Sequence, residues 1–212
     1  MKACVVVTDS NVKRAISVIE KFEIAEIRLD ICQFRTQYYK DLFSLPTKTI
    51  ATYREADPSN ASIQKMECLK KALECGAHYI DIELELNAQQ RDDLIRYAKG
   101  YEAKVIISHH DFDKTAKIEV LKDKIDLARS LGADIVKLVT KVNFRDDCLT
   151  LFNLYKGEEN LVAFGMGEEA KFTRAASLYL GAPFTYVNYL NSNKTAEGQL
   201  GYKEFQAIRA IC

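Results

Sequence analysis

Residues that can do acid–base and covalent chemistry stand where short apolar runs of this 212-residue chain end. One run leads into Ser-His-His-Asp-Phe at 108–112, and another, at 134–140, contains a single lysine, Lys137. A lysine within an apolar strand either extends outward to solvent or points inward, where lost solvation and neighbouring arginines favour the neutral amine. Such an amine can form an imine with a carbonyl substrate, and a histidine at a neighbouring strand end can transfer the protons.

Three further runs carry charged or hydroxyl residues at a spacing of two. These residues are Glu26, Arg28 and Asp30 in the first run, Thr52 and Arg54 in the second, and Asp81, Glu83 and Glu85 in the third. Residues two apart on a strand share a face, so each set points to one side of its strand. Burial of so many charges is costly unless they pair with one another or bind a ligand. A cross-strand ion-pair network and a ligand site therefore both remain open.

The histidines and cysteines do not indicate a metal site. His109 and His110 are adjacent, so on a strand they point to opposite faces. Neither a His-x-His nor a His-Glu-x-x-His spacing accompanies them, and the remaining histidine is His78. The six cysteines are scattered without a Cys-x-x-Cys pair. This pattern is typical of reduced thiols in a cytosolic protein rather than of zinc ligands or a disulfide framework.

The elements that must position these residues alternate between short β-branched runs and longer runs of helical period. We predict strands at 3–7, 24–30, 47–53, 79–83, 104–108, 135–139, 161–165 and 184–188. We predict helices at 11–21, 34–43, 62–75, 87–99, 118–131, 144–155, 173–180 and 202–211. Eight such units indicate an α/β protein with the (β/α)8 TIM-barrel fold, in which chemistry lies at the carboxyl ends of the strands. A doubly wound open sheet is the competing architecture.

A weak internal repeat supports this alternation. Gly76, Gly132 and Gly181 each follow a predicted helix and precede an alanine and a strand. Glycine just past a helix end is favoured because the left-handed cap conformation suits it. The chain has only three prolines and no Gly/Ser-rich linker or charged block, so we expect a single domain over 1–212.

Composition excludes several classes of protein. Thirty Lys+Arg against thirty Asp+Glu give a net charge of zero, which gives no electrostatic reason to expect nucleic acid or an anionic membrane as partner. A locally basic pocket for a small anion remains compatible with this balance. No apolar run approaches the roughly 20 residues that span a bilayer, and the N-terminal stretch is too short for a signal peptide. We therefore expect a cytoplasmic protein.

The chain resembles the type I 3-dehydroquinate dehydratase family through an ordered set of motifs. They are E-I-R-L-D at 26–30, T-Y-R at 52–54, D-I-E-L at 81–84, S-H-H-D-F at 108–112, D-I-V-K at 134–137, F-G-M-G at 164–167 leading to T-R at 173–174, and A-E-G-Q at 196–199. The resemblance implies a class I aldolase-like (β/α)8 barrel of the shikimate pathway, which serves aromatic amino-acid biosynthesis. It implies that 3-dehydroquinate loses water through a lysine Schiff base to give 3-dehydroshikimate, without metal or organic cofactor, in a homodimer.

The resemblance also implies residue roles. Lys137 would form the imine and His110 would be the general acid and base. The substrate-binding residues that it implies are Glu26, Arg28, Arg54, Arg174, Thr195 and Gln199, with Met166, Phe164 and Phe112 as an apolar pocket wall. Arg174 corresponds to the arginine that takes the substrate carboxylate.

Several positions depart from the family pattern. The segment at 195–199 reads Thr-Ala-Glu-Gly-Gln where the family usually has Ser-Ala-Pro-Gly-Gln. Threonine keeps the hydroxyl, but the loss of proline makes a lid less pre-organised. Phe164 replaces a methionine and still provides an apolar wall. The first predicted strand begins at residue 3, so we expect no N-terminal hairpin cap beneath the barrel.

The loop after the third strand carries the most consequential departure. The family often has a glutamate four residues after the third-strand arginine, and this glutamate orients the catalytic histidine. Here that position is Pro58, with only Glu55 and Asp57 nearby. Whether Glu55, Asp57 or neither orients His110 stays open.

Two other functions fit part of the pattern. A class I aldolase-type barrel acting on a sugar phosphate shares the lysine, but the late loops lack a Gly-rich phosphate cradle. A non-catalytic barrel that binds a metabolite or a partner is favoured by the altered loop at 54–58. The joint presence of Lys137, His110 and Arg174 argues against it.

Overall fold

A computed structural model describes residues 2–189 and 198–211 and contains one parallel nine-stranded sheet. The strands are β1 (Ala3–Val7), β2 (Ile24–Arg28), β3 (Lys48–Thr52), β4 (Tyr79–Glu83), β5 (Lys104–Asp111), β6 (Ile135–Lys141), β7 (Leu161–Met166), β8 (Thr185–Asn188) and β9 (Leu200–Gly201). The hydrogen-bonded order is β7-β6-β5-β4-β3-β2-β1-β8-β9, so within the described residues β7 and β9 are the edges. The prediction of a barrel-like β/α fold is confirmed, although β9 was not predicted.

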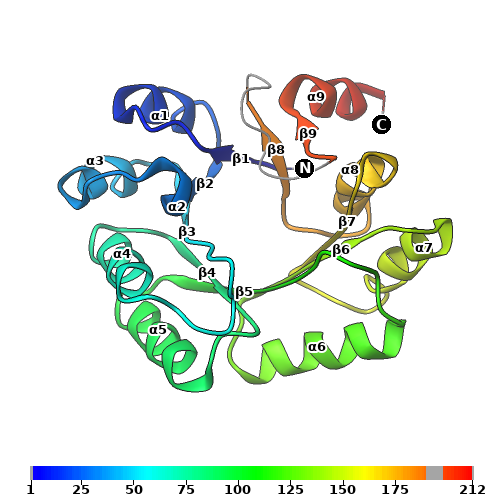
Figure 1. Ribbon diagram of the computed structural model, residues 1–212. Helices are drawn as coiled ribbons and strands as arrows, with labels where there is room; N and C mark the ends of the chain where they lie inside the picture. The colour runs from blue at the N-terminus through cyan, green and yellow to red at the C-terminus, as the bar shows by residue number, and fades with distance from the viewer. Residues whose placement is uncertain (1, 190–197, 212) are drawn as a thin grey trace.

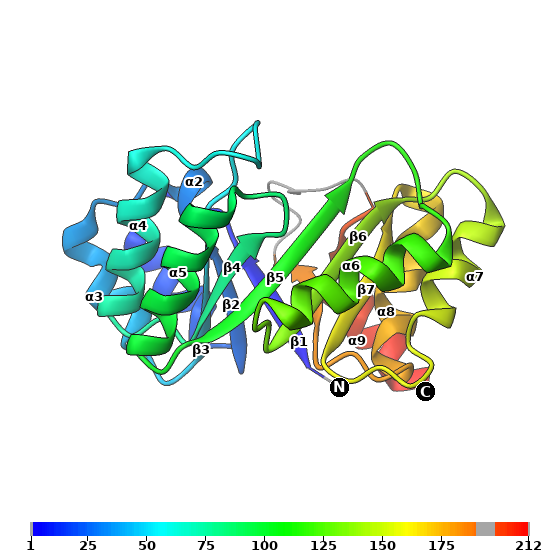
Figure 2. The ribbon, with the colours of Figure 1, turned by 90° about the horizontal axis from the view of Figure 1, so that it is seen from below.

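Helices surround the curled sheet on its outer side (Figure 1). They are α1 (Val12–Ile19), α2 (Leu29–Cys32), η1 (Thr36–Tyr38), α3 (Tyr39–Phe43), α4 (Ile63–Glu74), α5 (Ala88–Gly100), α6 (Ile118–Ser130), α7 (Arg145–Asn153), η2 (Glu168–Ala170), α8 (Lys171–Tyr179) and α9 (Tyr202–Ile211). In the view of Figure 2, α3, α4 and α5 lie on one side of β5 and α6, α7 and α8 lie towards the other. No helix of the described residues is long and apolar enough to cross a membrane.

Alternation along the strands separates two apolar clusters. On β2, for example, Ala25 and Ile27 join the large cluster between the sheet and the helices, whereas Ile24 joins a smaller cluster inside the curl. Because residues two apart share a face, Glu26 lies on the same side as Ile24, one step nearer the carboxyl end. The same step on β6 leads from Ile135 to Lys137. The inner cluster thus forms an apolar floor beneath the polar residues.

Three glycines end helices as the internal repeat predicts. Gly76, Gly132 and Gly181 follow α4, α6 and α8 with φ of +102°, +93° and +112°. An L-residue rarely adopts these angles, so glycine at each position lets the chain leave its helix and enter the next strand.

Two predicted elements change in kind, and β5 and β6 extend beyond the predicted strand ends at 108 and 139. The strand predicted at 24–30 ends at Arg28 because the chain turns into the short helix α2. Asp30 therefore does not share a strand face with Glu26, but accepts two hydrogen bonds from Arg28, at 3.0 and 2.6 Å. The helix predicted at 34–43 is divided into η1 and α3.

Candidate active site

A cavity of about 310 Å³ opens at the carboxyl ends of the strands. Its lining residues are Val6, Glu26, Arg28, Thr52, Arg54, Glu55, Ala56, Pro58, Glu83, Glu85, His109, His110, Phe112, Lys137, Val139, Phe164, Met166, Arg174, Tyr186 and Gln199. They come from nearly every strand of the sheet, which is the arrangement in which parallel barrels build active sites.

Lys137 projects from β6 into this cavity and is buried. Its Nζ donates a hydrogen bond to Asp81 Oδ2 at 3.1 Å and lies 3.6 Å from Glu26 Oε1. The amine also stands 4.2 Å from the centre of the Tyr186 ring, a cation–π contact. From the sequence, arginines were expected next to this amine, but the ion-pair partners among the described residues are the carboxylates of Asp81 and Glu26.

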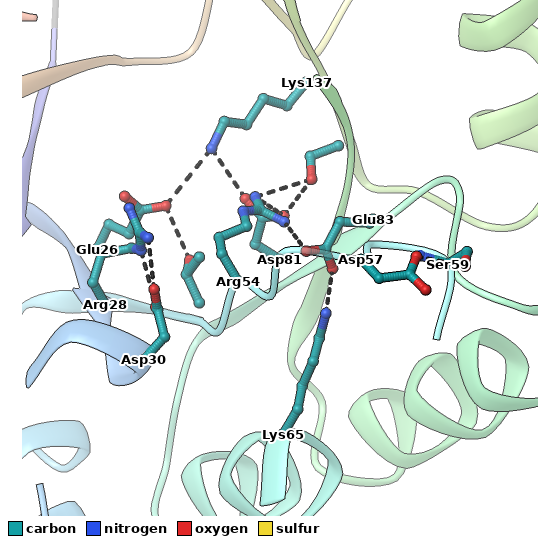
Figure 3. Close-up of polar contacts among 12 residues, drawn as sticks. Glu26, Arg28, Asp30, Arg54, Asp57, Ser59, Lys65, Asp81, Glu83 and Lys137 are labelled. Atoms are coloured by element: carbon teal, nitrogen blue, oxygen red, sulfur yellow. Dashed lines mark hydrogen bonds and ion pairs between the residues drawn. The ribbon is translucent and has the colours of Figure 1, made fainter. Parts of the chain in front are cut away.

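Arg54 binds two carboxylates of β4 (Figure 3). Its Nη2 lies 2.6 Å from Asp81 Oδ1 and 3.0 Å from Ser108 Oγ, and its Nη1 lies 3.0 Å from Glu83 Oε1. Burial opposes ionisation of Asp81, but Arg54 and Lys137 outweigh it and hold the pKa of this carboxyl well below its usual range. Asp81 is therefore a fixed negative charge beside the amine.

His110 lies at the end of β5, half-buried in the cavity wall, with its ring stacked on Phe112 at 6.2 Å. Burial, and then the charges of Arg54 and Lys137, hold the pKa of His110 well below its usual value. The imidazole is therefore neutral near pH 7 and ready to accept a proton. His109 also lines the cavity, and its Nδ1 contacts Glu85 Oε1.

Arg174 lies on α8, buried, with its guanidinium carbon 4.2 Å from the centre of the Phe164 ring. Among the described residues it has no ion-pair or hydrogen-bond partner, and its Nε is fully buried. Burial lowers the pKa of Arg174 to about 10. A buried cation without a counter-ion is costly, so this side chain is prepared for an anionic ligand.

The residues singled out from the sequence converge on this cavity. All the predicted site residues that the structure describes line it, namely Lys137, His110, Glu26, Arg28, Arg54, Arg174, Gln199, Met166, Phe164 and Phe112. Thr195 lies outside the described residues. Gln199 is buried next to Gly198, whose φ is +71°. A Cβ at Gly198 would approach the carbonyl oxygen of Gly167 to 2.2 Å, so glycine permits the segment to pack against the end of β7.

The loop after β3 does not orient His110 through a hydrogen bond in the described structure. Glu55 Oε2 accepts a hydrogen bond from the backbone N–H of Ser62, the N-cap residue of α4, at 3.1 Å. Asp57 Oδ1 accepts from the backbone N–H and the hydroxyl of Ser59, at 2.9 and 2.6 Å. Both carboxylates are thus engaged by their own loop and the following helix.

Two residues of the site were not singled out from the sequence, Tyr186 beside the amine and Lys65 behind Glu83. Tyr186 lies two positions after Phe184, and strand alternation would have placed both on the inner face. Lys65 on α4 binds Glu83 and is fully buried. Across residues 2–189 and 198–211, no three His, Cys, Asp or Glu side chains are grouped so that they could hold a metal ion.

A curled parallel β/α sheet defines a β/α-barrel enzyme when an amine, an imidazole and a guanidinium lie around one cavity, the guanidinium here having no partner in the described part of the chain. A family model for type I 3-dehydroquinase matches residues 3–211. The 3-dehydroquinate dehydratase of Methanocaldococcus jannaschii is 32% identical over 221 residues, covering 97% of this chain and 96% of the relative. That of Pyrococcus abyssi is 32% identical over 222 residues, covering 100% and 98%.

Solved structures agree in fold. The 3-dehydroquinate dehydratase of Aquifex aeolicus superposes with a TM-score of 0.83 at 24% identity, over 100% of this chain and 98% of the other. The type I enzyme of Clostridium difficile gives 0.83 at 24% identity, over 99% and 91%. The chain belongs to the type I 3-dehydroquinase family. Its activity is that of a 3-dehydroquinate dehydratase, a hydro-lyase of the shikimate pathway.

Proposed function

We propose that the protein dehydrates 3-dehydroquinate through a Schiff base on Lys137. The observation that carries the proposal is that Lys137 is the one lysine among the described residues that line the cavity. Its amine lies against two carboxylates, Asp81 and Glu26, whose negative charges can balance the positive charge of an iminium ion.

In the proposed reaction, Lys137 Nζ attacks the ketone carbon to give a carbinolamine, which loses water to form a protonated imine. The iminium withdraws electrons, so His110 can remove a proton from the adjacent carbon and leave an enamine. The enamine electron pair expels the neighbouring hydroxyl, to which His110 returns the proton. Water then hydrolyses the imine, which frees 3-dehydroshikimate and the amine. One water is released overall.

The remaining cavity residues bind and orient the substrate in this proposal. Arg174 takes the carboxylate, because a buried guanidinium that has no partner among residues 2–189 and 198–211 gains the most from an anion. Glu26, Arg28, Arg54 and Gln199 face the ring hydroxyls. The buried walls formed by Phe164 and Met166 exclude water from the imine, whereas Phe112 also lines the cavity but is largely exposed.

The test is an assay for the ultraviolet absorbance of the conjugated product, run beside borohydride trapping. Borohydride added during turnover should reduce the imine and leave a substrate-derived mass on the peptide that contains Lys137. Turnover without this adduct would overturn the Schiff-base mechanism. Absence of turnover with 3-dehydroquinate, in a panel that includes sugar phosphates, would overturn the function itself.

The substitution Arg174→Met is expected to have opposite effects on catalysis and stability. Loss of a buried, charge-paired contact to a substrate carboxylate lowers kcat/KM by about 10²- to 10³-fold, mainly through KM. The free protein, however, no longer buries an uncompensated cation, so its Tm should rise by a few degrees.

Steady-state kinetics and thermal denaturation measure these two effects. Arg96→Met is the control, because Arg96 is an exposed arginine 4.0 Å from Asp93. An unchanged KM for Arg174→Met would show that another group binds the carboxylate.

We further propose that the chain works as a homodimer in the cytoplasm. The described cysteines Cys4, Cys32, Cys68, Cys75 and Cys148 are free thiols, as suits a reducing compartment. Exposed aromatic side chains at the outer helices, such as Phe144 and Phe172, offer apolar surface to a second copy.

A further inference from the structure

A buried lysine that does not line the cavity lies behind the active site. Lys65, on the first turn of α4, is fully buried, and its Nζ lies 2.8 Å from Glu83 Oε2. It belongs to the apolar face of its helix, with Leu69 and Leu73. A buried ion pair in such a place is weak evidence for stability, because apolar residues usually serve as well or better. The pair therefore calls for a functional explanation.

Glu83 joins this lysine to the active site. Its Oε2 accepts the hydrogen bond from Lys65, whereas its Oε1 lies 3.0 Å from Arg54 Nη1. Glu83 Oε1 and Arg54 Nη1 are both buried, and they form an ion pair whose geometry is not that of a hydrogen bond. Lys65 thus donates the described hydrogen bond that Glu83 accepts, whereas Arg54 contacts Glu83 through an ion pair.

Arg54 also contacts the residues that surround the reactive amine. It donates a hydrogen bond to Ser108 Oγ at 3.0 Å, and Ser108 Oγ donates to Asp81 Oδ1 at 2.6 Å. Arg54 Nη2 lies 2.6 Å from Asp81 Oδ1, and Asp81 Oδ2 accepts from Lys137 Nζ at 3.1 Å. Positive and negative groups alternate along this buried series, Lys65–Glu83–Arg54–Asp81–Lys137. Figure 3 shows Lys65 and Lys137 approaching the two carboxylates and Arg54 from opposite sides.

We propose that Lys65 is a positioning residue for the dehydratase reaction, which acts through Glu83 and Arg54 on Asp81 and so controls how strongly Asp81 holds Lys137. This proposal rests on the proposed Schiff base. Without the charge of Lys65, Glu83 draws Arg54 towards itself. Asp81 then directs more of its charge to Lys137 and favours the ammonium form, which cannot attack a ketone.

Other charged or titratable groups also act on the Lys137 amine, and they limit how far the charge of Lys65 can influence its protonation. The charged or titratable groups that face Lys137 are Glu26 from β2, Asp81 from β4, His110 from β5, Tyr186 from β8, Cys4 from β1 and Arg54 from the loop after β3. All of these except Cys4 and Asp81 also line the cavity. Lys65 does not, so its replacement changes the charge near the amine without removing a contact to substrate.

The experiment measures the pH dependence of borohydride trapping at Lys137 and of kcat/KM in four variants. Lys65→Met should move the rise of trapping with pH upward by about one unit, and slow trapping about tenfold on the acid side. Glu83→Gln removes a negative charge and should lower the pH at which trapping rises. The double variant Lys65→Met/Glu83→Gln should return it towards wild type, and it also avoids an unpaired buried charge if Lys65→Met folds poorly. The matched control is Lys70→Met, on the same helix as Lys65, which breaks an ion pair with Asp93 of α5.

The pH at which trapping rises should shift in opposite directions in the two single variants. A merely structural role would not produce this result, because a packing defect lowers activity without moving the pH profile in a direction set by the charge removed. Equal pH profiles for wild type, Lys65→Met and Lys70→Met, with trapping intact, would overturn the role of Lys65 alone. Failure to trap wild type at any pH would instead overturn the Schiff base.

Discussion

Replacing Lys137 by alanine is expected to lower kcat by about 10⁴- to 10⁶-fold, the loss found when an enzyme loses its covalent nucleophile. The reason is that no other described lysine lines the cavity, so no second amine can form the imine. Borohydride trapping should disappear with turnover. Binding of substrate should persist, because Arg174 and Arg54 remain in the cavity.

Two further variants separate covalent chemistry from charge. Lys137→Arg keeps a cation beside Asp81 and Glu26, but a guanidinium remains protonated and forms no imine. It should therefore be as inactive as the alanine variant. Lys104→Ala, at the exposed opposite end of β5, should retain wild-type turnover. Substantial activity in Lys137→Arg would assign the lysine an electrostatic role and remove the Schiff base from the mechanism.

The fold was predictable because its signals are local. Runs rich in β-branched residues gave the strands, and glycines at positions 76, 132 and 181 marked helix ends through their positive φ. The end of β2 was not predictable in this way. Leu29 and Asp30 fit the alternating pattern, yet the chain turns into a helix where Asp30 pairs with Arg28. Element boundaries depend on such tertiary contacts, which a local pattern does not contain.

The site was predictable to the extent that strand ends converge. Glu26, Arg54, His110 and Lys137 lie together because their strands are parallel and polar residues follow apolar ones at each carboxyl end. The identity of the charged groups that lie next to the Lys137 amine was not predictable. The amine was expected among arginines, but Asp81 and Glu26 lie nearest in the described structure, because Arg54 turns towards β4.

Side chains on loops and helices were the hardest to place. Glu55 was a candidate to orient His110, but the free N–H groups at the start of α4 compete for its carboxylate, and Ser62 donates to it. Lys65 was not singled out from the sequence. Its spacing to Leu69 and Leu73, four and eight residues on, places it on the buried stripe of α4 and was the available signal.

His110→Asn is expected to lower kcat by about 10²- to 10⁴-fold, the usual contribution of a general acid–base group. Trapping at Lys137 should survive, because the amine and its carboxylates are unchanged, so the imine accumulates instead of eliminating water. His78→Asn is the matched control. His78 contacts Thr49 and is not among the residues that line the cavity, so turnover should be unaffected.

The pH profile provides a second, independent measurement of His110. The imidazole must be neutral to accept a proton, and its neutral fraction falls as pH decreases through its pKa. Because burial, Arg54 and Lys137 lower the pKa of His110, the acid limb of kcat should lie below the value of about 6.5 typical of free histidine. The parameter to measure is kcat, because it reports the complex in which the imine has formed and not the free Lys137 amine. The limb should vanish in His110→Asn. If that variant kept both turnover and limb, the base would have to be another group in the cavity, and His109, in contact with Glu85, is the neighbouring imidazole that could replace it.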